Sequence, residues 1–224
     1  HRLLWLFIEK HTDLFDGRRK KVLHVAPESC LSPRLQRELG NSYITADLLR
    51  SDVKVRMDIT NIEYPDESFD VIYCSHVLEH VEDDRAFVAG LVDRLPVGAR
   101  VLITVPANPA LYGRHDEVFG HHRRYTMHSL PPVWAALPVT VELCSPYCAA
   151  LYPAVWAIRT AQRPFGAAFG EGETDFKMPP APLNTLLRRL FSAERRPLRA
   201  LREGRGRPLP FGSSLIALLR KDSA

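Results

Sequence analysis

Short apolar segments alternate with helical or loop segments from residue 21 to residue 106, and this order most constrains the fold. Pro33 and Gly40 delimit one helical segment, and a second, at about 83–95, is closed by Pro96 and Gly98. Strands that alternate with such connections predict a parallel sheet with helices on both faces. We therefore expect an α/β fold with a doubly wound, mostly parallel sheet of seven strands. The expected strands are 21–26, 42–46, 53–57, 69–74, 100–105, 139–144 and 213–219.

The 224 residues fit one domain in which this sheet carries an elaboration before its last strand. Nine prolines between Pro146 and Pro210 interrupt that segment, which lacks the apolar periodicity of a separate core. No apolar run reaches the ~18 residues of a membrane-spanning helix, and the first residues do not resemble a signal peptide. Within the single domain, the expected parts are an N-terminal helix at 1–16, a sheet core at 17–145 with a helix at 127–137, an inserted helical cap at 146–210, and a closing strand at 211–224.

The four cysteines are too few and too scattered for a disulfide scaffold. They stand at 30, 74, 144 and 148, and none forms a C-x-x-C pair. This usage is typical of a reduced chain, so we expect a cytoplasmic protein. Zinc at Cys144 and Cys148 would need two further ligands, and we assign no metal site.

Acidic residues follow two of the expected strands. In open parallel sheets, ligands bind outside the carboxyl ends of the strands. Asp47 ends the second strand, 19 residues after Glu28, which approximates the spacing at which a carboxylate accepts hydrogen bonds from ribose hydroxyls. Asp58 ends the third strand and could accept from an exocyclic amine such as that of adenine. Either residue could simply cap a turn, but the pair in register favours a nucleoside site.

Four segments within residues 20–106 resemble the class I S-adenosylmethionine-dependent methyltransferases, which have a Rossmann-like fold. The last of the four, from Asp66 to Val81, is the most specific, because Asp66, Phe69, Asp70, Leu78, Glu79 and His80 stand in the family's order. The other three are V-L-H-V-A-P-E at 22–28, Y-I-T-A-D-L at 43–48 and M-D-I-T at 57–60. The resemblance implies S-adenosylmethionine as cofactor. It implies cofactor contacts from Ala26, Pro27, Glu28, Asp47, Leu48, Asp58, Ile59, Ser75 and His76.

The first of these segments departs from the family pattern. His24 takes the place of an acidic residue, and Ala26-Pro27-Glu28 replaces G-x-G. This loop resembles an A-P-E branch of the family, in which Glu28 would contact the ammonium group of the cofactor. A degenerate loop in a non-catalytic, methyltransferase-like subunit is the alternative.

A polar loop after the fifth strand carries the expected acceptor-side residues. It resembles a D-x-x-x-G-H-x-R-R-Y-T segment of some bacterial methyltransferases, often of unassigned substrate. We expect a small-molecule or glycan-type acceptor. His121 is the candidate general base, because imidazole titrates near neutral pH. Asp116 would orient it and Tyr125 would position it, unless the loop is merely a solvated one in which Arg123 pairs with Asp116. The candidate substrate contacts are Arg114, His122, Arg123 and Arg124.

His76, Glu79 and His80 also match H-x-x-E-H, a zinc-peptidase pattern. That pattern requires a long helix, whereas an apolar strand runs directly into His76. A zinc hydrolase is therefore a distant alternative.

The net charge of +4 comes from one segment, since 184–207 holds eight arginines against two glutamates. Pro197 is expected to split it into two short helices. A cap with a solvated basic face is the default interpretation, and contact with a membrane surface is the second. A nucleic-acid patch is least favoured, because no binding motif accompanies the charge, so we expect no nucleic-acid partner.

Overall fold

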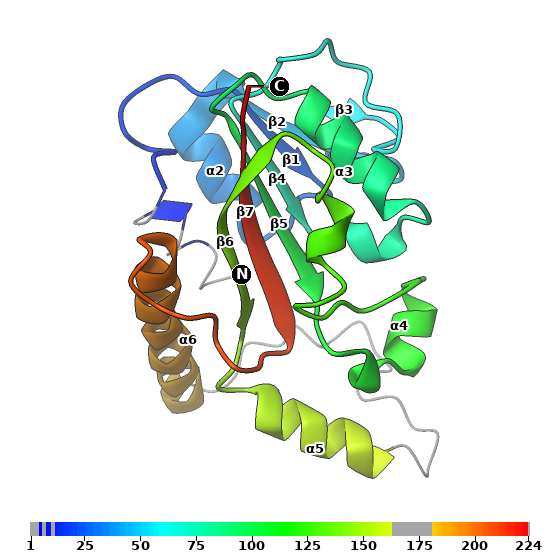
Figure 1. Cartoon of the computed structure of the whole chain (residues 1–224), viewed down its shortest axis with the longest axis vertical. Coiled ribbons are helices and arrows are strands. Elements are labelled where there is room, and N and C mark those ends of the chain that lie inside the picture. Colours follow the sequence, from blue (N-terminus) through cyan, green and yellow to red (C-terminus); the bar gives the residue numbers. More distant parts are fainter. Residues whose placement is uncertain (1–4, 6–7, 10–11, 163–180, 224) are drawn as a thin grey trace.

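The computed structural model describes residues 5, 8–9, 12–162 and 181–223. Half of the residues of the N-terminal helix predicted for 1–16 lie outside the described residues, as does part of the predicted cap. Residues 5 and 8–9 are helical, whereas 12–16 form bends and turns, so the prediction is wrong for those last residues. The described chain forms one seven-stranded sheet in the order β3-β2-β1-β4-β5-β7-β6, in which β7 alone runs opposite to the other six strands (Figure 1). This confirms the predicted fold class. The strands are β1 Val22–Val25, β2 Tyr43–Asp47, β3 Val55–Arg56, β4 Val71–Ser75, β5 Arg100–Pro106, β6 Val139–Tyr147 and β7 Ser214–Lys221.

The strand order reverses between β1 and β4. The chain runs outward from β1 through β2 to β3, and then returns to pair β4 with the other side of β1. Connections that leave neighbouring strands in opposite directions open a crevice at the carboxyl ends of those strands. In Figure 1 the short helix α4, Arg114–Val118, and α5, Tyr152–Gln162, lie beyond the carboxyl end of β5. The fold therefore brings the loops after β1, β2, β4 and β5 to one edge.

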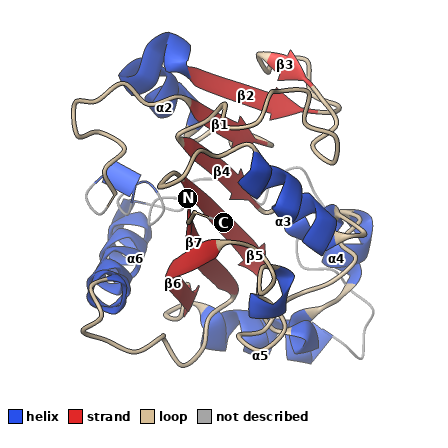
Figure 2. Cartoon of the chain, turned by 45° about the horizontal axis from the view of Figure 1, so that its top comes forward, coloured by secondary structure: helices blue, strands red, loops and turns tan. Residues whose placement is uncertain are grey.

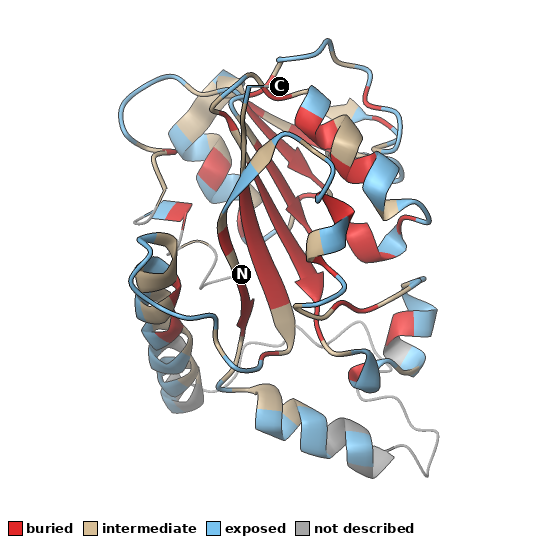
Figure 3. Cartoon of the chain, viewed as in Figure 1, coloured by how far each residue is buried: buried red, intermediate tan, exposed pale blue. Residues whose placement is uncertain are grey.

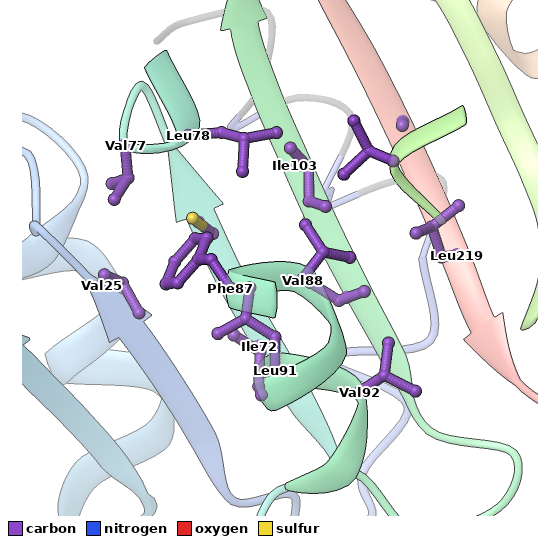
Figure 4. Packing of buried hydrophobic residues seen from close by; sticks show 14 of the residues in the cluster. Val25, Ile72, Val77, Leu78, Phe87, Val88, Leu91, Val92, Ile103 and Leu219 are labelled. Atoms are coloured by element: carbon purple, nitrogen blue, oxygen red, sulfur yellow. The ribbon is translucent and has the colours of Figure 1, made fainter. Parts of the chain in front are cut away.

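Helices cover the two faces of the sheet (Figure 2). Helix α3, Asp84–Asp93, begins at Asp83, whose side chain accepts a hydrogen bond from the Ala86 N–H at 2.9 Å. Its apolar face packs on the sheet, as the close-up shows for Phe87, Val88 and Leu91 (Figure 4). On the opposite face lie α2, Ser32–Leu39, and α6, Ala181–Arg202.

The second face has its own apolar core, to which α2 contributes Leu35 and α6 contributes Leu198. Both side chains are buried, together with Tyr43 and Leu102 from the sheet. Figure 3 shows the central strands buried and the outer faces of the helices exposed. Burial on both sides explains why β1 is apolar at every position except His24.

The helix predicted for 127–137 is wrong. Those residues form only a turn of 3-10 helix, Pro131–Val133. Two consecutive prolines at 131 and 132 remove backbone donors, and Pro138 prevents continuation into a regular helix. Leu130, Val133 and Trp134 are buried nonetheless. The spacing of apolar residues in this segment therefore reflects contacts with the core, although the segment is not a helix.

The predicted split at Pro197 is also wrong, because α6 continues through it as one helix of 22 residues. Leu198 is fully buried, and Glu194 accepts hydrogen bonds from the N–H groups of Cys148 and Ala150 at 2.7 and 3.0 Å. These contacts hold the helix against the end of β6 on the amino side of Pro197 and against the sheet just after it.

Among the described helices, none combines the length and the apolar character that spanning a membrane requires.

Gly212 is required where the chain enters β7. A Cβ atom there would overlap the backbone of Tyr147, the last residue of β6. We expect Gly212→Ala to lower the free energy of unfolding by about 1–3 kcal/mol, the usual cost of overpacking. Thermal or urea unfolding measures this. Gly90→Ala in α3, where an added Cβ meets nothing within 4 Å, is the matched control and should be neutral or stabilising. Equal stability of Gly212→Ala and the unmodified chain would contradict the packing argument.

Candidate active site

Asp47 stands at the carboxyl end of β2 and keeps one carboxylate oxygen for a ligand. Its Oδ1 accepts hydrogen bonds from the N–H groups of Leu49 and Arg50 at 2.8 and 3.0 Å. Among the described residues no hydrogen-bond partner is found for Oδ2, and the residue is half-buried. These bonds fix the carboxylate at the sheet edge, in the place expected for a ribose-binding group. Leu48 beside it is 51 % exposed.

Asp58 follows β3 and is similarly fixed by its own turn. Its Oδ1 accepts from the Thr60 hydroxyl at 2.7 Å and from the Thr60 N–H at 2.8 Å. These two bonds lower the pKa of Asp58, which is exposed and therefore ionised at neutral pH. Ile59 packs against the core below it. Two anchored carboxylates thus lie at the ends of neighbouring strands, as the sequence predicted.

The loop after β1 turns at Ala26, which has a left-handed backbone with φ of 48°. Its N–H donates to Ala46 O at 2.9 Å, so the turn lies against β2. A left-handed conformation normally favours glycine, the residue that the family uses in this loop. Ala26 therefore keeps the backbone path of a glycine turn although the G-x-G pattern is missing.

His24 packs beneath the A-P-E loop and contacts its Glu28. It is fully buried, and its two ring nitrogens contact the Tyr43 hydroxyl at 2.5 Å and Glu28 Oε2 at 2.7 Å. The other oxygen of Glu28 accepts from the Tyr73 hydroxyl at 3.0 Å. Burial raises the pKa of Tyr43 to about 12. Both oxygens of the Glu28 carboxylate therefore contact side chains below the loop. This means that Glu28 stabilises the turn.

Ser75 is the last residue of β4 and His76 follows it, and the two side chains differ in burial. Ser75 is buried, and its hydroxyl is hydrogen-bonded to that of Thr104 at 2.9 Å, so its side chain supports the sheet. His76 adopts a left-handed backbone with φ of 53°, and its side chain is 37 % exposed. Its Nδ1 lies 3.1 Å from Glu79 Oε1. Of the two, only His76 is exposed to solvent at this end of the sheet.

The polar groups at this edge of the sheet fit an adenosine cofactor with a charged tail. Asp47 and Asp58 supply acceptors for hydroxyl and amine groups, and the turn at Ala26 brings backbone close to the same edge. These features come from three consecutive strands on one side of the point where the strand order reverses.

On the other side, Asp116 and His121 form the centre of the loop after β5. Asp116 is fully buried, and its Oδ1 lies 2.8 Å from His121 Nδ1 and 2.9 Å from Arg124 Nε. Burial alone would raise the pKa of Asp116, yet hydrogen bonds from His121 and Arg124 hold it well below its usual range. An ionised Asp116 places the His121 proton on Nδ1, so that the lone pair lies on Nε2. This is the orientation that the sequence analysis expected.

Three other loop residues lie differently from the predicted roles. Arg124 is buried, and besides Asp116 it donates to Ala107 O at 3.2 Å, so it supports the loop instead of facing an acceptor. Tyr125 is buried too, and its hydroxyl donates to Asp84 Oδ2 at 2.9 Å. Burial raises the pKa of Tyr125, so its hydroxyl stays protonated. Arg123 pairs with Asp84 at 3.1 Å and not with Asp116.

Arg114 and His122 are the exposed members of the predicted substrate set. Arg114 begins α4, next to the loop centre. The backbone N–H of His122 donates to Glu79 O at 2.7 Å, which ties this loop to the turn after β4. The side chains of both residues are accessible to a bound acceptor.

The tie between the two loops produces a cluster that the sequence analysis did not assign. Glu79, His80 and His121 offer side-chain ligand atoms that all lie within 4.8 Å of one another. The rings of His80 and His121 meet edge to face, with centroids 4.6 Å apart. Burial lowers the pKa of His80. The H-x-x-E-H pattern pointed to Glu79 and His80, but the segment forms a 3-10 turn, Leu78–His80, and not a long helix.

Comparisons with known proteins bear on the fold and on part of the sequence. Residues 31–103, about a third of the chain, match a family model described as a methyltransferase domain. A search of curated protein sequences found no match.

Solved structures share the whole fold at low sequence identity. A methyltransferase from Mesorhizobium loti that depends on S-adenosylmethionine is similar with a TM-score of 0.59 and 13 % identity, covering 98 % of each chain. One from Archaeoglobus fulgidus gives 0.52 and 16 %, covering 99 % of this chain and 95 % of the other. Phosphoethanolamine N-methyltransferase 2 from Haemonchus contortus, solved with S-adenosyl-L-methionine, gives 0.53 and 11 %, covering 99 % of this chain and 52 % of that enzyme.

Proposed function

We propose that the chain is a class I S-adenosylmethionine-dependent methyltransferase, and that it transfers the methyl group of this cofactor to a small-molecule or glycan-type acceptor. S-adenosylmethionine is the methyl donor of the family, and the acceptor class is our proposal. The observation that carries the proposal is the pair of anchored carboxylates, Asp47 and Asp58, at neighbouring strand ends beside the reversal of strand order.

The proposed binding mode assigns one part of the cofactor to each strand end. Oδ2 of Asp47 accepts from the ribose hydroxyls, and Asp58 with Ile59 lies on the adenine side. Backbone of the turn at Ala26 and Pro27 lies along the methionine part, with His76 facing it. The Glu28 carboxylate, which His24 and Tyr73 hold beneath the same turn, is the proposed contact for the ammonium group.

The cofactor supplies a sulfonium methyl group, which an acceptor attacks in line. A new bond forms between the acceptor atom and the methyl carbon, the bond from sulfur to that carbon breaks, and sulfur keeps the electron pair as neutral S-adenosylhomocysteine. Alignment supplies most of the acceleration in such a displacement. An acceptor hydroxyl must also lose a proton, and Nε2 of His121, oriented through Asp116, is the proposed recipient.

The proposal is tested by incubating the protein with S-adenosylmethionine labelled in its methyl group and with panels of hydroxylated small molecules and oligosaccharides. We expect label in an acceptor together with stoichiometric S-adenosylhomocysteine. Cofactor binding without transfer to any acceptor in the panels would instead favour a methyltransferase-like subunit that is not catalytic.

We also propose that α6 contacts a membrane surface. Leu186 and Leu190 are 53 % and 38 % exposed, and Arg189 is exposed beside them. An exposed face with apolar and basic side chains is typical of interfacial helices. We expect the protein to float with vesicles containing phosphatidylserine, and much less with neutral vesicles. Leu186→Ser/Leu190→Ser should abolish flotation. Equal flotation with both vesicle types would contradict the contact.

A further inference from the structure

The cluster of Glu79, His80 and His121 has the composition of a metal site. Two imidazoles and one carboxylate converge from two different loops, and their ligand atoms lie within 4.8 Å of one another. Ligands bound at zinc-like distances lie about 3–3.5 Å apart, so side-chain rotation alone would bring these atoms around one ion. His80 is exposed, which leaves the cluster accessible from solvent.

Glu79 supplies an independent indication of a missing ligand. The side chain is fully buried, and its Oε2 has no hydrogen-bond partner among the described residues. Its Oε1 is held by His76 at 3.1 Å. A buried carboxylate oxygen without a partner is costly, and a cation removes that cost. Glu79 is also the only residue of this three-residue cluster with a carboxylate, so a cation bound there would contact its negative charge.

The surrounding contacts orient the cluster as outer partners orient metal ligands. Asp116 holds Nδ1 of His121 at 2.8 Å, the carboxylate–histidine arrangement that leaves Nε2 for a metal. Asp116 is itself fixed by Arg124. The bond from the His122 N–H to Glu79 O joins the two loops at the cluster. The buried groups around the acceptor loop thus hold its histidine beside the turn after β4.

We propose that Glu79, His80 and His121 bind a divalent first-row transition metal ion. Imidazole ligands favour zinc, iron, cobalt or nickel over magnesium. Three protein ligands leave coordination positions open for an exogenous group. This part rests on the proposed function: the group would be a hydroxyl or phenolic oxygen of the methyl acceptor, whose pKa the ion would lower so that its proton passes to solvent before the oxygen attacks the methyl carbon. In that case the nucleophile is an oxygen, and His121 acts as a ligand of the ion.

The test is a titration of untagged protein with Co²⁺, followed by visible absorption and calorimetry. We expect one ion per chain with the visible bands of cobalt bound by nitrogen and oxygen ligands. His80→Ala, which removes an exposed side chain and should fold normally, is expected to weaken binding at least 10-fold, as is Glu79→Gln. The matched control is His128→Ala, because His128 is exposed and outside the cluster. That variant should bind cobalt like the unmodified protein.

Binding of less than one equivalent, or binding that His80→Ala does not weaken, would overturn the metal site. S-adenosylmethionine binding is measured on the same samples to separate the two proposals. Cofactor binding without cobalt binding overturns the metal site alone. Cobalt binding without cofactor binding overturns the proposed function and leaves the site.

Discussion

Replacing His121 with alanine is expected to lower the methyl-transfer rate by about 100- to 10,000-fold, the range lost when a positioned acid–base group is removed. The expectation holds whether His121 accepts the proton itself or holds the proposed ion, because both roles use Nε2. Affinity for S-adenosylmethionine should stay within about twofold, since His121 contacts Asp116, Tyr112 and the ring of His80 in the loop after β5 and the turn after β4, away from Asp47 and Asp58. Single-turnover transfer and calorimetry measure the two quantities.

The control for this variant is His128→Ala, which removes an exposed imidazole from the same polar segment. Its rate and cofactor affinity should match those of the unmodified protein. Loss of cofactor affinity in His121→Ala would place His121 in the cofactor site and contradict the assignment. Unchanged transfer would remove it from the reaction altogether.

Replacing Asp47 with asparagine is expected to weaken S-adenosylmethionine binding by about 10- to 100-fold. Asparagine can keep Oδ1 as the acceptor for Leu49 and Arg50, so the turn after β2 should persist. It replaces Oδ2 with an amide nitrogen that cannot accept from the ribose. Hydrogen bonds to a charged group contribute roughly 1.5–3 kcal/mol, which corresponds to the stated loss. Calorimetric titration with the cofactor and with S-adenosylhomocysteine measures it.

Asp93→Asn is the matched control, because Asp93 is exposed at the end of α3, away from the carboxyl ends of the strands. Its affinity should equal that of the unmodified protein. If Asp47→Asn bound the cofactor as tightly as Asp93→Asn does, the ribose would have to lie elsewhere.

The sheet was predictable from sequence because its strands are short, apolar and separated by helix-ending residues. The carboxyl ends of β2 and β3 could likewise be located, since Asp47 ends β2 and Asp58 follows β3 by two residues. Pro131 and Pro197 show where such reasoning fails. Two adjacent prolines prevent a helix at 131–132, whereas Leu198 and Glu194 hold α6 together across Pro197.

The acceptor loop was only partly predictable because its charged residues look alike in sequence. Arg123 and Arg124 are neighbours, yet Arg124 is buried against Asp116 and Arg123 reaches Asp84. Which guanidinium supports the loop depends on the direction of the chain after β5, and local sequence does not encode it. Glu79 and His121 are 42 residues apart in the sequence, so their proximity emerges only when β4 pairs with β5.

The central claim, that S-adenosylmethionine binds at the carboxyl ends of β1, β2, β3 and β4, is tested most directly by titrating the unmodified protein with that cofactor in a calorimeter. We expect saturable binding of one molecule per chain, with competition from S-adenosylhomocysteine. No measurable binding of either compound by folded protein would contradict the claim, whatever the acceptor or metal results.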